Sequence, residues 1–332
     1  MAPSPASASV PNGAANRLIT LDVAVTNPSG QPIPGLQQQD FMVLDDKQPQ
    51  KIASFQAAET STATAEPPAE VILVLDQVNT SYQHVTTSRQ EVEKFLSQNS
   101  GEFPWPVSIV FFTDSGAAET TPTRDARTLL KDLKENQHPL PNAKRAQGVY
   151  GAVDRLNLSV RTLGQLANYE AKRPGRKIVI WISPGWSLLS TPRIDLTTKD
   201  QQGLFSSIVG LSDDLRRARI TLYNVDPRGS GSVTRDYYKD FIKPVTAARQ
   251  VRGGELGLQV LAYQSGGLVL NSGNDLAAEI ATCAADASSF YVLSFEAAAA
   301  DAPTEYHALD VKVDKPDVKV RTRSGYYAQP QP

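Results

Sequence analysis

The segment VILVLDQVNTSYQ, residues 71 to 83, decides the fold of this chain. Five apolar residues, Val71 to Leu75, lead directly into Asp76 and then into small polar residues. An uninterrupted apolar run of this length predicts a strand buried on both faces, as in a parallel sheet covered by helices. Asp76 would then stand at the carboxyl end of that strand, where open α/β sheets bind ligands. We call the edge formed by these carboxyl ends the rim.

Strands and helices continue to alternate after this segment, which predicts an α/β domain over residues 70–288. Further apolar strands are expected at PVSIVFFTD, RKIVIWIS and ITLYNVD, and amphipathic helices at SRQEVEKFLSQN and QQGLFSSIVGLSDDLRRAR. Continuous apolar strands between helices indicate a mostly parallel sheet with helices on both faces. The fold class is therefore α/β and Rossmann-like.

Both ends of the chain have the alternating pattern of antiparallel strands, so we predict an N-terminal β segment at 17–59 and a C-terminal one at 289–328. Neither has enough strands to be stable alone, and chain ends tend to lie close together. We expect the two segments to pair in a small antiparallel module into which the α/β domain is inserted. Residues 1–16 are small, polar and proline-rich, which predicts a disordered linker. A methionine directly on such a linker indicates that an export signal has been removed.

The composition excludes several classes of protein. A net charge of −2 leaves no basic surface for nucleic acid, so we expect no nucleic-acid partner. No apolar run approaches the roughly 20 residues of a membrane span. The single cysteine, Cys283, forms no intrachain disulfide and lies in a helical pattern, which predicts a small buried residue.

Several blocks of the chain together resemble one known family. In chain order they are LDVAVTNPSGQPIPGLQQQDFMVLDDKQPQKIASF, VILVLDQVNTSYQ, RKIVIWISPGWS, ITLYNVDPRG, LAYQSGGLVLNSGNDL and VKVRTRSGYYA. They resemble the von Willebrand factor A-related proteins of the Acidobacteria type. The resemblance implies a Rossmann-like von Willebrand A domain, flanking β segments and a secreted, periplasmic or cell-surface location. It implies no particular ligand.

The resemblance also implies a Mg²⁺ or Mn²⁺ site at the rim, because von Willebrand A domains often hold a divalent cation there. Asp76 matches the first aspartate of that site, Thr80 matches its second hydroxyl, and Ser183 follows a later strand. Val78 stands where the first hydroxyl belongs, and Gln147 stands near the place of the later threonine. We therefore expect a degenerate metal-ion-dependent adhesion site that binds Mg²⁺ or Mn²⁺ weakly, if at all. The alternative is that Asp76 caps the following turn and Thr80 caps the next helix.

Two long loops, residues 183–200 and 226–254, follow strand ends and are expected at the same rim. The second mixes aromatic residues with arginine and lysine, a composition enriched at protein interfaces. The alternative is a long surface loop whose aromatic side chains fold back on the domain. The predicted ligand-binding residues of the rim are Asn79, Trp186, Asp226, Arg228, Tyr237, Tyr238 and Phe241.

No known catalytic motif assembles from the sequence, and we predict no catalytic residue and no resident cofactor. His84, His138 and His307 have no zinc-binding spacing, and the sequence contains neither GxSxG nor GxGxxG. We expect an exported, non-enzymatic module that binds a protein or an extracellular surface ligand. The alternatives are metal-dependent adhesion through Asp76 and Thr80, and a hydrolase with a site that the motifs do not reveal.

Overall fold

The structure is a computed structural model that describes residues 18–59, 68–98, 101–136, 148–186, 196–229, 236–271, 273–297, 300, 302 and 304–328. The predicted linker at 1–16 and the position of Gln147 and His138 lie outside these residues. Within the described part, none of the helices combines the length and hydropathy that a membrane span requires.

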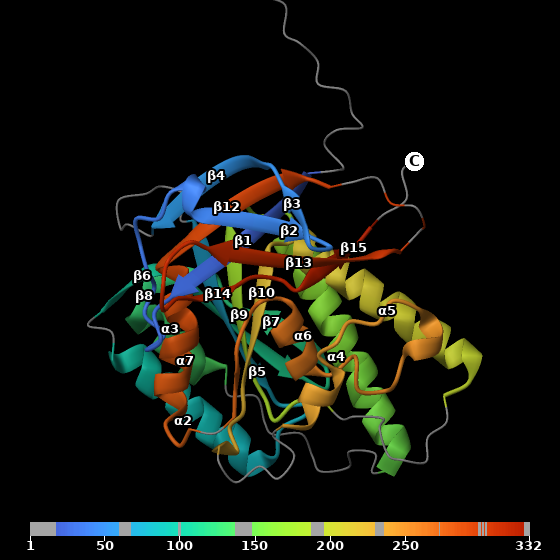
Figure 1. Ribbon diagram of the computed structural model, residues 1–332. Coiled ribbons are helices and arrows are strands. Elements are labelled where there is room, and N and C mark those ends of the chain that lie inside the picture. The colour runs from blue at the N-terminus through green and yellow to red at the C-terminus, as the bar shows by residue number, and fades with distance from the viewer. Residues whose placement is uncertain are drawn as a thin grey trace, which may run out of the picture.

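A central sheet of mostly parallel strands forms the middle of the α/β domain (Figure 1). Its order is β11 (Val269–Leu270), β10 (Ile220–Val225), β9 (Arg176–Ile182), β5 (Ala69–Asp76), β6 (Glu102–Thr113) and β7 (Gly116–Glu119). Only β7 and the short β8 (Thr123–Asp125) run antiparallel to their neighbour β6. In chain order this is the doubly wound 3-2-1-4-5-6 arrangement, whose strand order reverses between β5 and β9. The rim above that reversal is where such sheets bind ligands.

Helices cover both faces of this sheet, which confirms the predicted fold class. One face packs against α2 (Tyr82–Gln98), α3 (Ala126–Glu135) and α7 (Leu276–Ala284), and the other against α4 (Gly148–Glu170), α5 (Thr198–Arg217) and α6 (Leu258–Gln264). Strand β5 shows why its sequence is apolar throughout. Val71 and Leu73 belong to the core under α2 and α7, whereas Ile72 and Val74 belong to the core under α4 and α5.

The two ends of the chain pair in a β module of two four-stranded sheets, as predicted. One sheet has the order β14 (Lys319–Arg321), β1 (Leu18–Thr26), β12 (Ser289–Glu296), β4 (Ile52–Glu59). The other has the order β15 (Gly325–Tyr327), β13 (Tyr306–Val313), β2 (Phe41–Asp45), β3 (Gln48–Gln50). Their pairs β1–β12 and β2–β13 join the N-terminal to the C-terminal segment. Apolar side chains from both segments, among them Leu21, Phe41 and Leu293, make the core between the sheets.

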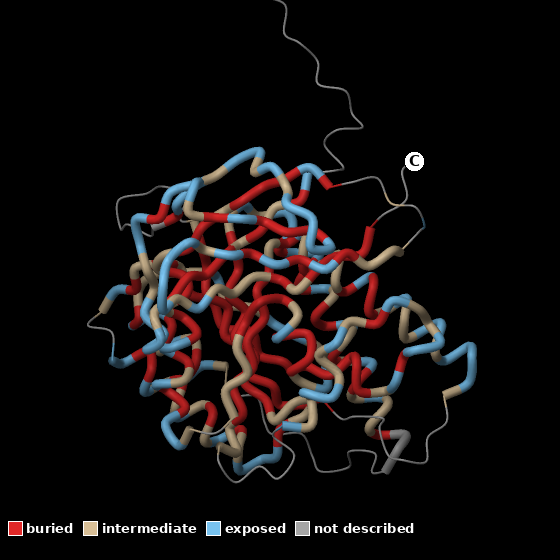
Figure 2. The backbone as a smooth tube through the Cα atoms, viewed as in Figure 1, coloured by how far each residue is buried: buried red, intermediate tan, exposed pale blue. Residues whose placement is uncertain are grey.

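The β module lies at the amino ends of the parallel strands, on the side opposite the rim (Figure 1). The central strands β5 and β9 are buried along their whole length, in the red interior of the molecule (Figure 2). Arg219, just before β10, forms an ion pair with Asp22 of β1. The Tyr327 hydroxyl donates to the carbonyl of Val245 at 2.8 Å, which ties β15 to the segment that precedes α6. Short 3₁₀-helices complete the described structure at η1 (Gln38–Asp40), η3 (Tyr237–Phe241), η4 (Ala248–Gln250) and η5 (Ala285–Ala287).

Candidate binding site at the rim

Asp76 stands at the end of β5, beside the point where the strand order reverses, and is 2% exposed. Its two carboxylate oxygens accept four hydrogen bonds from N–H groups. Oδ1 accepts from the backbone N–H groups of Val78 at 2.9 Å and Asn79 at 2.8 Å. Oδ2 accepts from the Asn79 side-chain amide and from the Trp181 indole Nε1, both at 2.9 Å. The carboxylate is therefore held by donors of its own chain.

The surroundings of Asp76 do not fit a metal ion. Burial raises the pKa of Asp76, and the hydrogen bonds from Trp181, Asn79 and Ser183 oppose that rise. Among the described residues, no arginine or lysine pairs with the carboxylate. N–H donors occupy both oxygens, and an N–H group pointing at an oxygen excludes a cation from that direction. Val78, where the resemblance requires a hydroxyl, is fully buried in the core.

The structure brings Asn79 and Ser183 to Asp76 and adds two residues that the sequence analysis missed. The Asn79 amide bridges Asp76 and the hydroxyl of Ser159 in α4, at 2.9 Å from each. The Ser183 hydroxyl also accepts from the N–H of Gly185 at 3.2 Å. Trp181 lies in the middle of an apolar strand, so its sequence context indicates only a core residue.

Thr80 is buried in the turn after β5 and precedes Ser81, after which α2 begins at Tyr82. The Ser81 hydroxyl and the His84 Nδ1 are 2.8 Å apart in the first turn of that helix. Ser81, rather than Thr80, thus occupies the position before the helix.

Asp226, at the end of β10, is neutralised within its own loop. The Arg228 guanidinium bonds both oxygens of Asp226, with the closest approach at 2.7 Å, and the Arg228 backbone N–H donates to Oδ1 at 2.9 Å. The same guanidinium donates to the carbonyl of Pro184 at 3.0 Å, which joins the two rim loops. Trp186 of the first loop is only 3% exposed and packs edge-on against Trp181. Its side chain belongs to the core under the rim.

The aromatic residues of the second loop lie along α6 rather than projecting from the rim. The Tyr237 hydroxyl donates to Gln259 in the first turn of α6 at 3.4 Å. The Phe241 ring lies under the Arg252 guanidinium, 4.4 Å from its centroid, and fills the space beside Gly254. Burial raises the pKa of Tyr237. Tyr237 and Phe241 therefore support this segment, as in the fold-back alternative.

Other aromatic side chains remain on the surface near that segment. Tyr238 is partly buried, and its pKa is raised by burial and also by neighbouring groups that include Tyr263. Tyr263, at the end of α6, is 48% exposed. We call Tyr238 and Tyr263 the aromatic face. Tyr82, which follows the rim turn, is 68% exposed. Tyr82 and Tyr263 were not predicted, because exposure of a single tyrosine in a helix leaves no periodic signal.

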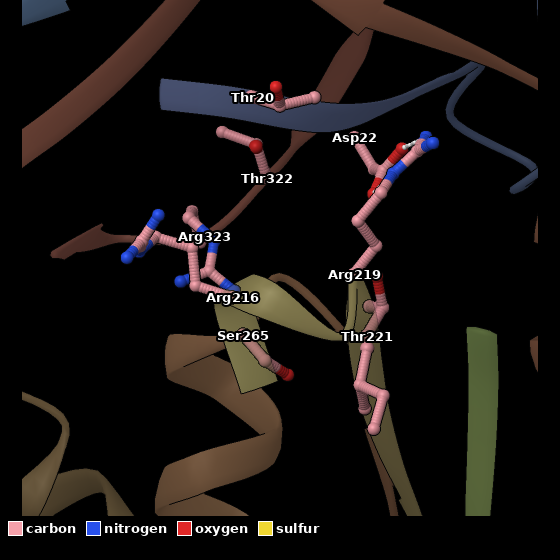
Figure 3. Close-up of a pocket in the computed structure, with 9 residues that line it drawn as sticks. Thr20, Asp22, Arg216, Arg219, Thr221, Ser265, Thr322 and Arg323 are labelled. Carbon is pink, nitrogen blue, oxygen red and sulfur yellow. Dashed lines mark hydrogen bonds and ion pairs between the residues drawn. The ribbon is translucent and has the colours of Figure 1, made fainter. Parts of the chain in front are cut away.

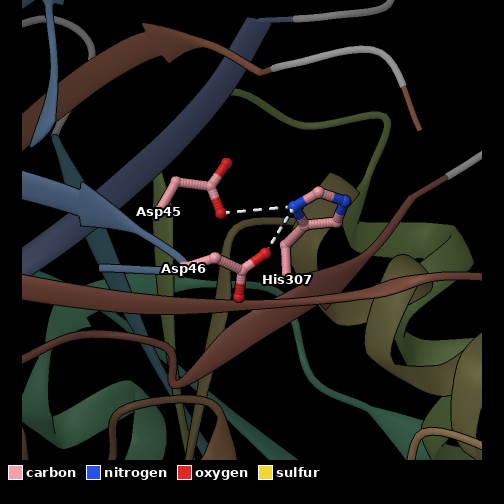
Figure 4. A group of neighbouring side chains, drawn as sticks. All are labelled: Asp45, Asp46 and His307. Atoms are coloured by element: carbon pink, nitrogen blue, oxygen red, sulfur yellow. Dashed lines mark ion pairs between the residues drawn. The ribbon is translucent and has the colours of Figure 1, made fainter. Parts of the chain in front are cut away.

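A group of metal-ligand types lies in the β module instead of at the rim (Figure 4). The imidazole Nδ1 of His307 is 3.4 Å from Asp45 Oδ1 and 3.1 Å from Asp46 Oδ2. The other oxygen of each carboxylate accepts a protein hydrogen bond at 2.9 Å, from the Tyr326 hydroxyl to Asp45 and from the Ala308 N–H to Asp46. The three ligand atoms lie within 4.8 Å of one another and could hold a metal ion. We call these residues the module triad.

The spacing of the histidines has no zinc pattern, so the sequence gives no sign of this group. The pairing of β2 with β13 creates the module triad, since it places residues far apart in the chain side by side. Burial raises the pKa of Asp45, and the hydrogen bond from Tyr326 opposes the rise. The His307 ring stacks on Tyr326 with its centroid 5.0 Å away, which fixes its orientation.

Comparison with known proteins gives distant structural likenesses. No family model matches the chain, and no curated protein matches it. One similar structure is the proximal thread matrix protein 1 of the mussel byssus with a zinc-occupied MIDAS motif, at 9% identity and TM-score 0.38, covering 73% of this chain and 49% of that one. Another is an aerotolerance-related membrane protein from Bacteroides fragilis, at 14% identity and TM-score 0.34, covering 66% and 97%. A third is the pilus adhesin SpaC from Lactobacillus rhamnosus GG, at 9% identity and TM-score 0.41, covering 90% and 48%. This chain spans about half the length of the byssus and pilus proteins.

Proposed function

We propose that this chain is a non-enzymatic binding module that contacts a protein or an extracellular surface ligand without a metal ion at its rim. The saturation of Asp76 by four N–H donors carries the proposal. A rim carboxylate that bridges two proteins through a cation needs oxygens turned towards that cation. Asp226 supports the same reading, because Arg228 neutralises it from the same loop.

The aromatic face is the proposed contact surface. Tyrosine offers a large, rigid area with a polar tip, and interfaces are enriched in it. The contacts of Tyr237 and Phe241 fix the segment against α6. Tyr238, in this segment, and Tyr263, in α6, are therefore held in place before a ligand binds. A surface that is ordered before binding loses less conformational freedom on association.

The hydrolase alternative finds less support at the rim. The Ser81–His84 pair has the distance of a nucleophile and its base, but it is exposed and spans one helical turn. Among the described residues, no carboxylate bonds the His84 ring to orient it. That pair is therefore assigned to the start of α2. The proposal includes a secreted, periplasmic or cell-surface location, as the family resemblance implies.

We infer that a divalent cation, where the chain binds one, is held by the module triad. Two carboxylate oxygens and an imidazole nitrogen suit Zn²⁺ or Mn²⁺ better than Mg²⁺, which prefers oxygen ligands and keeps several waters. The bonds from Tyr326 and Ala308 orient the carboxylates from outside, as groups around metal ligands commonly do. Asp46 is half-exposed and gives an ion access from solvent.

Peptide selection followed by direct binding measurements tests the proposed contact surface. Phage-displayed peptides would be selected on the wild-type chain in EDTA, and the affinity of each purified peptide measured by calorimetry. We expect Tyr238→Ala and Tyr263→Ala to weaken binding by about tenfold or more, the scale of an interface hot spot. Tyr169→Ala is the matched control, since Tyr169 is 55% exposed on α4. Peptides that bind both variants as tightly as wild type would refute the assignment of the aromatic face.

A further inference from the structure

A polar pocket lies where the β module meets the amino ends of the parallel strands (Figure 3). It is at the opposite end of the molecule from the rim, so it is independent of the proposed function. Its walls come from β1, the end of α5, the start of β10, the turn after α6 and the link between β14 and β15. The polar residues that line it are Thr20, Asp22, Arg216, Arg219, Thr221, Ser265, Thr322 and Arg323.

The pocket holds one more positive charge than the neighbouring carboxylates neutralise. Arg219 is paired with Asp22, and Arg216 is paired with Asp213. Arg323 is 9% exposed and forms no hydrogen bond or ion pair with any described residue. Three guanidinium groups thus face two carboxylates, and Asp213 also pairs with Arg217 outside the pocket.

Arg323 is charged under ordinary conditions. Burial and the nearby Arg216 lower its pKa to about 10, which still leaves it protonated at neutral pH. The carboxylates of Asp22 and Asp213 attract the guanidinium without bonding it and oppose the lowering of its pKa. A cation in a largely buried side chain is unfavourable unless an anion compensates its charge. In the same pocket wall, the buried Thr322 hydroxyl has no hydrogen-bond partner among the described residues. Both groups are donors, and neither donates to a described residue.

We propose that this pocket binds a small monovalent inorganic anion of the size of chloride, held by Arg323, Arg216 and Thr322. An anion there would supply the missing negative charge and accept from the Thr322 hydroxyl. The hollow has room for about one water-sized particle, which favours a halide over phosphate or sulfate. Because Arg216 belongs to the α/β domain and Arg323 to the β module, the anion would join the two parts of the chain.

Thermal unfolding at constant ionic strength tests the proposal. Sodium gluconate, whose anion is too large for the pocket, would be replaced stepwise by sodium chloride or bromide. We expect the melting temperature to rise by a few degrees and to saturate, because an anion that binds only the folded chain stabilises it. Sodium phosphate and sodium acetate, at the same ionic strength, should give no saturable rise.

Two variants locate the effect. Arg323→Met keeps the apolar stem and removes the charge, so the chloride-dependent rise should disappear, while stability in gluconate should equal or exceed that of wild type. Arg249→Met, at an exposed arginine outside the pocket, should keep the full rise. If Arg323→Met does not fold, Thr322→Val should still reduce the affinity for chloride several-fold.

Crystals soaked in bromide provide a direct readout. An anomalous peak between Arg323, Arg216 and Thr322 is the expected result. A rise that is equal in the Arg323→Met variant, a rise of the same size in phosphate or acetate, or a pocket without bromide would each overturn the proposal.

Discussion

The indole Nε1 of Trp181 donates a 2.9 Å hydrogen bond to Oδ2 of Asp76, across the point where the strand order of the sheet reverses. Trp181 belongs to β9 and Asp76 to β5, the two strands on either side of that reversal. The carboxylate at the position where doubly wound folds bind ligands is thus already hydrogen-bonded by a core residue.

Replacing Trp181 with phenylalanine tests how far this bond stabilises the rim. The ring contacts with Phe112 and Trp186 are largely kept, but a buried carboxylate loses a donor. We expect the free energy of unfolding to fall by about 2–4 kcal/mol, from the lost charge-assisted bond and the smaller ring. Urea unfolding measures it.

Trp105→Phe is the matched control, because Trp105 is also buried but its indole N–H donates to none of the described residues. If the two variants lost the same stability, the bond to Asp76 would contribute nothing beyond ring volume.

Metal titration distinguishes the rim from the module triad. We expect Zn²⁺ or Mn²⁺ to raise the melting temperature of wild type and of Asp76→Ala equally, because Asp76 has no oxygen turned towards a cation. His307→Gln and Asp46→Asn should lose the rise, since each removes one ligand of the triad. Scanning calorimetry after EDTA treatment gives the baseline.

His84→Gln is the control for this titration, since the His84 ring bonds only Ser81 among the described residues. If the metal-dependent rise in melting temperature persisted in His307→Gln but disappeared in Asp76→Ala, the cation would bind at the rim and not at the triad. If no metal raised the melting temperature of wild type or of any variant, the triad would be a hydrogen-bonded group that binds no metal.

Glu70 makes stability depend on pH. It forms an ion pair with Arg173 at 2.6 Å, yet burial outweighs that pair and raises the pKa of Glu70 from 4.5 to about 7. The folded chain therefore holds this proton more tightly than the unfolded chain does. The resulting stability is fully present below pH 4.5 and is lost as the pH rises through about 7.

Glu70→Gln mimics the protonated side chain at every pH and should remove this pH dependence. As the pH rises from 4.5 to about 7, the stability of the variant relative to wild type should increase by about 3 kcal/mol. Urea unfolding from acidic to mildly alkaline pH measures the difference, with Glu135→Gln on the exposed side of α3 as control. A difference that does not change with pH would contradict the assignment.

The Tyr291 hydroxyl fastens the N-terminal β segment to the C-terminal one. It accepts from the Leu36 N–H at 3.0 Å and donates to the Ile33 carbonyl at 2.7 Å. Tyr291→Phe keeps the ring and leaves both backbone groups without this partner. We expect a loss of about 1–3 kcal/mol in urea unfolding. An unchanged stability would mean that water replaces the hydroxyl on both groups.

Much of the fold was predictable because it rests on short-range patterns. The apolar run before Asp76 predicts a strand buried on two faces, and in the structure its residues alternate between two cores. The pairing of the chain ends followed from two segments that each had too few strands.

The candidate site was less predictable because it depends on side chains brought together by the fold. Nothing in RKIVIWIS distinguishes Trp181 from its apolar neighbours, since only its direction brings the indole N–H to Asp76. His307 meets Asp45 through the register of β13 on β2. Arg323 and Arg216 meet in one pocket through the packing of two distant segments, which no local pattern records.

The pairing of the N-terminal with the C-terminal β segment also determines the order in which parts of the chain can fold. Thr20 of β1 contacts Ser294 of β12 across 274 positions of sequence. Such a contact closes a very long loop. The entropic cost of closing that loop decreases once the intervening domain has become compact. During synthesis, β1 and β4 are made before the α/β domain, whereas their common partner β12 is made after it. These two strands therefore stay unpaired while the domain is synthesised, and their open edges are exposed to aggregation during that time.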